Sequence, residues 1–298
     1  MTIESITIIG AGSIGGTVAF GLLANEDRFH IKEILFVDMS TDITQAQVID
    51  LSDGSLGETI IRGATFKEAG RSDLIILAAN TPLIEEESKR KWLLRSQRFI
   101  DGIVASMLPI QLEAFIIVAV EPVEMFVNQL RKTTSLKSER IMGVGHTSIC
   151  NRRFQKWFKQ CEKGMNGNNF NPWVIGTAKF PLIIWPQAEG EKQKEILEEI
   201  KRNWVGAIMF HSTLIKDKKG DAWFGTSASV IELVKILLGS DPNHTITTIV
   251  CTFHPSLDIC TSFPVTINNQ GITSVLEINL SDTEQNTLIS TTSEYYTA

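Results

Sequence analysis

The sequence has no apolar run that approaches the roughly 18 residues a membrane-spanning helix needs. Its N-terminus, Met1 to Ser5, carries Glu4 and lacks a basic start followed by an apolar stretch, so we expect no secretory signal. Basic residues are scattered along the chain and the formal net charge is −6. These features disfavour nucleic acid and anionic membrane surfaces as partners.

Cysteine and histidine are sparse and widely spaced. The four cysteines contain no CxxC pair; they are Cys150, Cys161, Cys251 and Cys260. This usage is typical of reduced thiols in a cytoplasmic protein, which is the compartment we expect. The five histidines are far apart and none lies in a ligand motif, so we expect no metal site.

The 298 residues, 43% of them hydrophobic, are enough for a sizeable core and for two domains or one large α/β unit. Four short runs in the first half are apolar almost throughout: Ile6–Ile9, Ile34–Val37, Leu74–Leu77 and Phe115–Val118. Such runs are typical of strands buried on both faces, as in parallel sheets. Helix-length segments lie between them, such as 13–25 and 86–108. The alternation predicts a doubly wound α/β domain of the Rossmann type over residues 1–143.

The second half, residues 144–298, predicts an α+β domain that packs against the first as one unit. Helical spacing of apolar residues predicts helices over 148–163, 191–215 and 228–238. Strands are expected at 174–175, 182–185, 245–253, 259–267 and 272–278. A last helix should start at Ser281, because Ser281 and Glu284 have the spacing of a capping box.

A dinucleotide-binding motif follows the first expected strand. Gly10-Ala11-Gly12-Ser13-Ile14-Gly15 is a GxGxxG sequence that opens a helix, and its glycines suit a tight turn, close approach of a pyrophosphate and close packing. Asp38 ends the next strand, 28 positions after Gly10, somewhat beyond the usual spacing of about 20. A carboxylate there accepts hydrogen bonds from an adenine ribose and repels a 2′-phosphate, so NAD is favoured over NADP. The alternative is a glycine turn that merely closes a βα unit.

With this motif in place, nearly the whole chain resembles the lactate/malate dehydrogenase family, including its 2-hydroxyisocaproate dehydrogenases. The segments that carry the resemblance are ITIIGAGSIGG, LFVD, AQVIDLSDG, VEPVEM, GVGHTSICNRRF, VIGTAKF and FPVTINNQGI. The resemblance implies a Rossmann domain followed by an α+β substrate domain, with NAD as the cofactor. It places Ala79, Asn80 and Val120 beside the cofactor, where Asn80 replaces a glycine that the family has near the pyrophosphate.

The catalytic positions that the resemblance implies have lost their chemistry. The family's proton-donating histidine falls on Ala178, and the aspartate that supports it falls on Ile149 or Cys150. The asparagine that polarises the substrate carbonyl falls on Glu121, whose negative charge has the wrong sign beside a developing alkoxide. His146 is expected near the same cleft, either as a replacement acid or as a half-buried polar residue at a helix start.

Cationic positions survive better in this comparison. The lid arginine of the family falls on Lys89, with Arg90 beside it, and the arginine that clamps the substrate carboxylate falls on Arg152 or Arg153. Ungapped counting selects Arg152, whereas the Arg-Phe pair formed with Phe154 slightly favours Arg153. Alternatively, these charges belong to solvated helix faces.

Three functions compete on these residues. The first is an active NAD-dependent 2-hydroxy-acid dehydrogenase with a rebuilt acid/base, and the second is a catalytically silent NAD(H)-binding relative, a pseudoenzyme. The third is a structural oligomer that keeps only the fold. The intact glycine motif and Asp38 argue against the third, and Ala178 with Glu121 argues against the first. We therefore favour the second, with a small 2-oxo or 2-hydroxy acid as ligand and assembly as a homodimer or homotetramer, as the resemblance implies.

Overall fold

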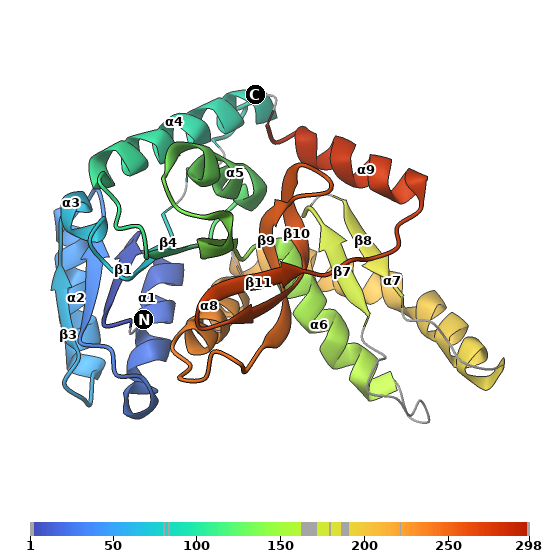
Figure 1. Ribbon diagram of the computed structural model, residues 1–298, viewed down its shortest axis with the longest axis horizontal. Coiled ribbons are helices and arrows are strands. Elements are labelled where there is room, and N and C mark those ends of the chain that lie inside the picture. The colour runs from blue at the N-terminus through green and yellow to red at the C-terminus, as the bar shows by residue number, and fades with distance from the viewer. Residues whose placement is uncertain are drawn as a thin grey trace.

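The computed structural model describes residues 3–79, 81–82, 84–161, 172–178, 180–185, 191–220 and 222–296 (Figure 1). The strands of the first half are β1 (Ser5–Ile9), β2 (Glu33–Val37), β3 (Ile60–Gly63), β4 (Leu74–Leu77), β5 (Phe115–Val118) and β6 (Ile141–Gly143). Its α-helices are α1 (Ser13–Leu23), α2 (Thr41–Gly54), α3 (Phe66–Ala69), α4 (Lys89–Met107) and α5 (Val123–Thr133). Two 3₁₀ turns, Glu26–Arg28 and Ser138–Arg140, complete this half.

These six strands form a parallel sheet in the order β3-β2-β1-β4-β5-β6. One buried apolar cluster joins the sheet to α1 and another joins it to α4 and α5, so both faces of the sheet are covered. The order reverses direction between β1 and β4, which is the topological switch point where doubly wound folds bind ligands. The Rossmann-type parallel sheet expected from the apolar runs is therefore confirmed.

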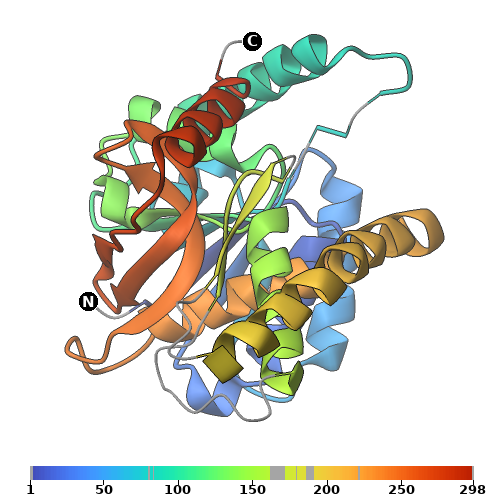
Figure 2. The same ribbon diagram turned by 90° about the vertical axis from the view of Figure 1, so that its right-hand side faces the viewer.

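The second half continues the same sheet with antiparallel strands. Its elements are α6 (His146–Cys161), β7 (Trp173–Gly176), β8 (Pro181–Ile184), α7 (Glu191–Lys219), α8 (Trp223–Leu237), β9 (Ile246–His254), β10 (Ile259–Asn268), β11 (Gly271–Val275) and α9 (Asp282–Ser293). The halves meet where β6 pairs with β9, at Gly143 and Cys251. Apolar residues of α8 join the cluster that covers α1, which packs the two halves together. Figure 2 shows α7 along the outer side of α6. The division into 1–143 and 144–298 stays a prediction.

Several expected boundaries were wrong by a few residues, and capping explains one of them. The helix expected from residue 86 begins at Lys89, because the Ser88 side chain accepts a hydrogen bond from the Lys91 backbone N–H and caps the helix there. The helices expected from 148 and 228 begin earlier, at His146 and Trp223. The capping box of Ser281 with Glu284 is confirmed at the start of α9.

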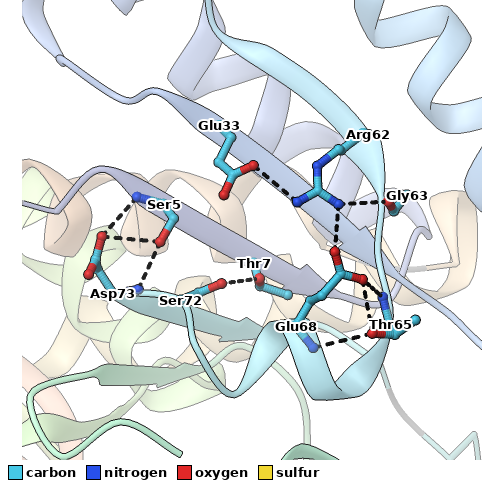
Figure 3. A network of polar contacts seen from close by, with 9 residues as sticks. All are labelled: Ser5, Thr7, Glu33, Arg62, Gly63, Thr65, Glu68, Ser72 and Asp73. Carbon is cyan, nitrogen blue, oxygen red and sulfur yellow. Dashed lines mark hydrogen bonds and ion pairs between the residues drawn. The ribbon is translucent and has the colours of Figure 1, made fainter.

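Polar contacts, most of them partly exposed, link neighbouring elements of the parallel sheet (Figure 3). The Asp73 carboxylate accepts hydrogen bonds from the Ser5 backbone and hydroxyl, at 2.9 and 3.1 Å, and the Thr7 and Ser72 hydroxyls lie 2.6 Å apart. Arg62 pairs with both Glu33 and Glu68 on neighbouring elements. The first two contacts link β1 to the segment that leads into β4, and the Arg62 pairs separately link β3 to β2 and α3.

Candidate functional site

The glycine loop lies at the switch point, between β1 and α1. Gly10 has φ +109°, and a Cβ there would lie 2.5 Å from the Ala79 backbone nitrogen, so only glycine fits this close approach of two strands. A Cβ on Gly15 would lie 2.1 Å from the Gly10 carbonyl oxygen, so glycine here lets α1 pack closely against the turn that precedes it. A Cβ on Gly12, by contrast, would meet no atom within 4 Å, so the loop is open at the position expected to face a pyrophosphate.

Beside this loop is a cavity of about 230 Å³. It is lined by Ile9, Gly10, Gly12, Val37, Asp38, Met39, Phe66, Ala78, Ala79, Phe99 and Ile103. The Asp38 carboxylate is fixed at its edge, because one oxygen accepts from the Ala11 backbone N–H at 2.9 Å and the other from the Ser40 N–H at 3.0 Å. Among the expected cofactor residues, Ser13 and Ile14 open α1 and Val120 is buried in the core, whereas Asn80 lies outside the described residues.

This geometry fits a dinucleotide. The N-cap of α1 is Gly12, which supplies no side-chain cap, so the first N–H groups of the helix are left for another acceptor. Such N–H groups and the helix dipole favour an anion, which a pyrophosphate supplies. The carboxylate of Asp38 would face the ribose, and the apolar cavity walls suit an adenine ring.

A second group of expected site residues gathers where β5, β6 and β7 end. One Glu121 carboxylate oxygen accepts from the His146 backbone N–H at 2.9 Å, and the other accepts from the Val123 N–H at 3.2 Å. A Cβ on Gly145 would lie 2.8 Å from the same Glu121 carboxylate, so glycine at this position allows the approach. The acid is therefore held in place by the backbone of two turns, and its charge is a fixed feature of the site.

Glu124 is a functional candidate that sequence reasoning missed. It lies in the first turn of α5, is 1% exposed, and both of its carboxylate oxygens are buried without a hydrogen-bond partner among the described residues. Burial, and then the neighbouring Glu121 charge, raises the pKa of Glu124 well above its ordinary value, although Lys89 opposes the shift. Glu124 therefore keeps its proton to a higher pH than an exposed glutamate does, and burial destabilises its ionised form. A charged residue inside an otherwise apolar run, Val123 to Val127, was the available signal.

The position of the missing histidine lies beside a tyrosine from the C-terminus, which sequence reasoning also missed. Ala178 follows β7 and is half-buried. Tyr295, which is 7% exposed, lies near the side chain of Thr177, the neighbour of Ala178, and this side chain acts to lower the pKa of Tyr295. Burial and then the charges of Glu124 and Glu121 raise the pKa of Tyr295, so the phenol stays protonated. A protonated hydroxyl therefore lies near the position that the resemblance gives to the proton donor.

The expected lid residues open α4. Lys89 is its first residue, and the Lys89 ammonium pairs with Glu294 at 3.0 Å and lies 4.5 Å from the centre of the Tyr295 ring. Arg90 is exposed at the same end of the helix. Lys89 is thus brought together with Glu124 and Tyr295, whereas no contact links Arg90 to these residues.

The two candidate clamp arginines point in different directions from α6. Arg152 pairs with Glu232 of α8 and lines a cavity of about 200 Å³ between α6, α8 and β9. Arg153 donates to the Ser212 hydroxyl of α7 at 2.9 Å, and its charge acts on both His146 and Cys150. Arg153 is therefore the arginine on the side of Glu121 and His146.

The two residues at the position that the resemblance gives to the supporting aspartate lie on different sides of α6. Cys150 is buried on the Arg153 side, and burial raises the pKa of its thiol, opposed by Arg153. Ile149 instead packs toward Gly225 of α8. Burial lowers the pKa of His146, with Glu121 opposing and Arg153 adding to the shift, so this imidazole is neutral at pH 7.

Two absences hold for the part of the chain that the structure describes. Histidine, cysteine and carboxylate side chains there form no group of three or more suited to a metal ion. Within the same residues, every helix is too short or too polar to cross a membrane.

Comparison with known proteins assigns the first half of the chain. A family model described as the lactate/malate dehydrogenase NAD-binding domain matches residues 4–143, and the family's α/β C-terminal domain matches residues 183–295. The glycine loop and Asp38 lie within the first match. The cofactor of this protein is NAD.

Relatives cover almost the whole chain. L-lactate dehydrogenase A of Rhizopus oryzae is 26% identical, with 96% of this chain and 89% of the relative covered. Malate dehydrogenase of Bacteroides fragilis is 23% identical over 95% of this chain and 92% of the relative. Among solved structures, a lactate dehydrogenase from a Medee basin deep-sea metagenome library has a TM-score of 0.84 at 15% identity, covering 99% of this chain and 98% of that chain. Both halves thus match one family in order, and the chain belongs to the lactate/malate dehydrogenase family.

Proposed function

We propose that this protein binds NAD(H) but has lost, or nearly lost, the family's histidine-dependent reduction of 2-oxo acids. The observation that carries the proposal is Ala178, a residue that cannot transfer a proton, at the position that the resemblance gives to the proton donor. In the family reaction, NADH supplies a hydride to the substrate carbonyl while a side chain supplies the proton. This chain retains residues that suit the cofactor and lacks the expected acid.

Electrostatics around Glu121 supports the same conclusion. A positioned acid/base contributes about 10²–10⁴ in rate, or about 3–5 kcal/mol. The Glu121 carboxylate is held by two backbone N–H groups, so it cannot easily turn away from a developing alkoxide. Its charge destabilises that alkoxide and adds to the loss. The missing aspartate adds less, because its role is to support the histidine.

The proposal extends to the setting of the protein. We infer that it is a cytoplasmic homo-oligomer, a dimer or tetramer, built from a dinucleotide-binding domain (1–143) and a substrate-type domain (144–298). Relatives named as lactate and malate dehydrogenases support a small 2-oxo or 2-hydroxy acid as its ligand.

Cofactor binding is tested by titrating NADH and NADPH and following energy transfer from tryptophan. We expect saturable NADH binding and weaker NADPH binding by the wild type. Asp38→Ala should bind the two cofactors with similar affinity. No saturation by NADH below millimolar concentration, or tighter binding of NADPH, would contradict the proposal.

The catalytic loss is tested by restoring the family residues. Ala178→His alone should recover little activity, because Glu121 and Cys150 also differ from the family pattern. The triple variant Ala178→His, Glu121→Asn, Cys150→Asp should exceed the summed effects of the single changes, since these groups act as a unit. Independent, additive gains would show that the three positions do not form one site.

A retained carboxylate clamp is part of the proposal, and Arg153 is the residue we assign to it. A guanidinium offers two parallel donors to a carboxylate and needs no proton donor nearby. Calorimetry with oxamate in saturating NADH should show binding that Arg153→Gln abolishes. Arg152→Gln is the matched control, because Arg152 is paired with Glu232 on another side of α6. Equal binding by both variants and the wild type would remove the clamp from the proposal.

A second candidate function is an active dehydrogenase in which His146 replaces the missing acid. The contact of Glu121 with the His146 backbone N–H favours it, because this contact holds His146 at the site. Against it, the lowered pKa leaves His146 without the proton that a reduction needs at pH 7. This candidate predicts NADH oxidation that rises as the pH falls below about 6.5 and that His146→Gln abolishes.

A further inference from the structure

The last described residues of the chain reach the substrate side of the molecule. In Figures 1 and 2, α9 ends beside the start of α4, and the contacts identify the residues that meet there. Glu294 pairs with Lys89 at 3.0 Å, and the Tyr295 ring lies 4.5 Å from the Lys89 ammonium. We call Lys89, Glu294, Tyr295 and Tyr296 the C-terminal clasp.

The clasp is anchored on both sides. The Tyr296 hydroxyl accepts from the Cys260 backbone N–H and donates to the Cys260 carbonyl, both at 2.7 Å, which fixes the end of the chain to β10. Tyr295 is buried in the same apolar cluster as Val120, Val123 and Cys251. These contacts place the phenol within the fold, where it is shielded from solvent.

The clasp meets two positions that the family resemblance assigns to the substrate. Lys89 lies at the position that the resemblance gives to the lid cation, and its ammonium group already contacts the Glu294 carboxylate and the Tyr295 ring. Gly176, which ends β7 two residues before Ala178, pairs with Ser262 of β10. Tyr296 is hydrogen-bonded to Cys260 on that same strand, so the clasp lies at the end of β7 that leads to Ala178. An alanine leaves room where the resemblance implies an imidazole. The Tyr295 ring, which is buried at this end of the molecule, takes up space that a ligand would need.

We propose that the C-terminal clasp occupies the carbonyl end of the 2-oxo-acid site, so that an oxo acid binds only to molecules in which the clasp has opened. The inference rests on the proposed function, because it takes the expected substrate positions as the binding site. It adds that the chain's own C-terminus competes with the ligand. Opening would also free Lys89 from Glu294 and leave it available for a carboxylate.

The test loosens the clasp without altering the expected clamp or the cofactor site. Glu294→Gln removes the ion pair with Lys89, and Tyr296→Phe removes the anchor to Cys260. Glu277→Gln is the control, because it removes the same charge from an exposed position. Oxamate affinity is measured by calorimetry in saturating NADH, and NADH affinity is measured separately on every variant.

The expected magnitude follows from the population of open molecules. If about 1–10% are open, the apparent oxamate affinity is reduced by that fraction, so complete opening would tighten binding about 10- to 100-fold. Glu294→Gln removes only a half-exposed ion pair and should tighten binding by up to about fivefold. NADH affinity should stay unchanged. The control should bind oxamate as the wild type does.

The outcomes separate this inference from the proposed function. Tighter oxamate binding by both clasp variants, with an unchanged control, supports the clasp. Oxamate binding that equals the wild type in both folded clasp variants, or is undetectable in all, overturns it even where NADH binds. Loss of NADH binding throughout would instead overturn the proposed function. Because Glu294 and Tyr296 contact different elements, a folding failure in one variant leaves the other to decide.

Discussion

Glu124→Gln is the change that most sharply probes the acidic interior of the site. Glu124 is 1% exposed, and neither of its carboxylate oxygens has a hydrogen-bond partner among the described residues. Burial and then Glu121 raise its pKa, so the folded chain retains a proton that the unfolded chain releases. Glutamine keeps the shape of the side chain and cannot ionise. The variant therefore removes the titration with little change in volume.

The sign of the pH effect follows from proton linkage. The unfolded carboxyl has a pKa of about 4.3, whereas the folded one lies well above this. Between these two values the folded state binds more protons, so stability falls as the pH rises through this window, by up to about 1.4 kcal/mol per pH unit. From pH 5 to pH 7 the loss attributed to Glu124 reaches up to about 2.7 kcal/mol. Glu124→Gln should abolish this part of the slope.

The assay is urea unfolding of the wild type and Glu124→Gln at several values from pH 5 to pH 8. The difference in unfolding free energy should move in favour of the variant as the pH rises through this window, by up to about 1.4 kcal/mol per pH unit. Titrating groups that do not interact with Glu124, His146 among them, occur in both proteins and cancel in this difference. Exposed Glu277→Gln should run parallel to the wild type. A Glu124→Gln curve that also runs parallel would refute the raised pKa and the buried, unpartnered carboxyl on which it depends.

Four further changes test the scaffold of the fold and the site. Gly12→Asp should weaken NADH binding at least about tenfold with little loss of thermal stability, whereas Gly10→Ala should lower the unfolding temperature, because its Cβ would lie 2.5 Å from backbone. Asp73→Asn should cost about 1–3 kcal/mol in urea unfolding; burial raises the pKa of Asp73, but its hydrogen bonds lower it overall, so this contribution exists above about pH 3.9 and disappears as the pH falls through the folded pKa. Gly145→Ala, whose Cβ would lie 2.8 Å from the Glu121 carboxylate, should cost about 1–3 kcal/mol, measured in the same way. A neutral result at Gly10, Asp73 or Gly145 would contradict the contact assigned to it.

Local patterns predicted most of the fold. The apolar runs became β1, β2, β4 and β5 because strands buried on both faces must be apolar along their length. The glycine loop was also predictable from the sequence, because a tight turn at a strand end requires particular residues in nearby positions. The same holds for the capping box of α9, which needs only residues three positions apart.

The substrate side was harder to predict, because it depends on contacts between distant parts of the chain. Lys89 and Glu294 are 205 positions apart, and no local pattern indicates that they pair. Tyr295 follows a helix whose start was predicted, but the site it reaches depends on the packing of α9 across β10. Glu124 was not predicted, because the resemblance of the VEPVEM segment assigns a role to Glu121 and none to Glu124. Helix direction after Pro122 buries Glu124, and that direction is a tertiary property.

The central claim is that cofactor binding has outlived oxo-acid reduction, and single-turnover kinetics test it most directly. Enzyme saturated with NADH is mixed with pyruvate, oxaloacetate or a branched 2-oxo acid, and the loss of NADH absorbance is followed. We expect saturable NADH binding and a rate of about 0.1 to 0.001 s⁻¹ or slower, since an ordinary turnover near 10 s⁻¹ loses the factor of 10²–10⁴ that the missing acid supplies. A rate in the ordinary range, about 1–10³ s⁻¹, with any of these acids would contradict the account.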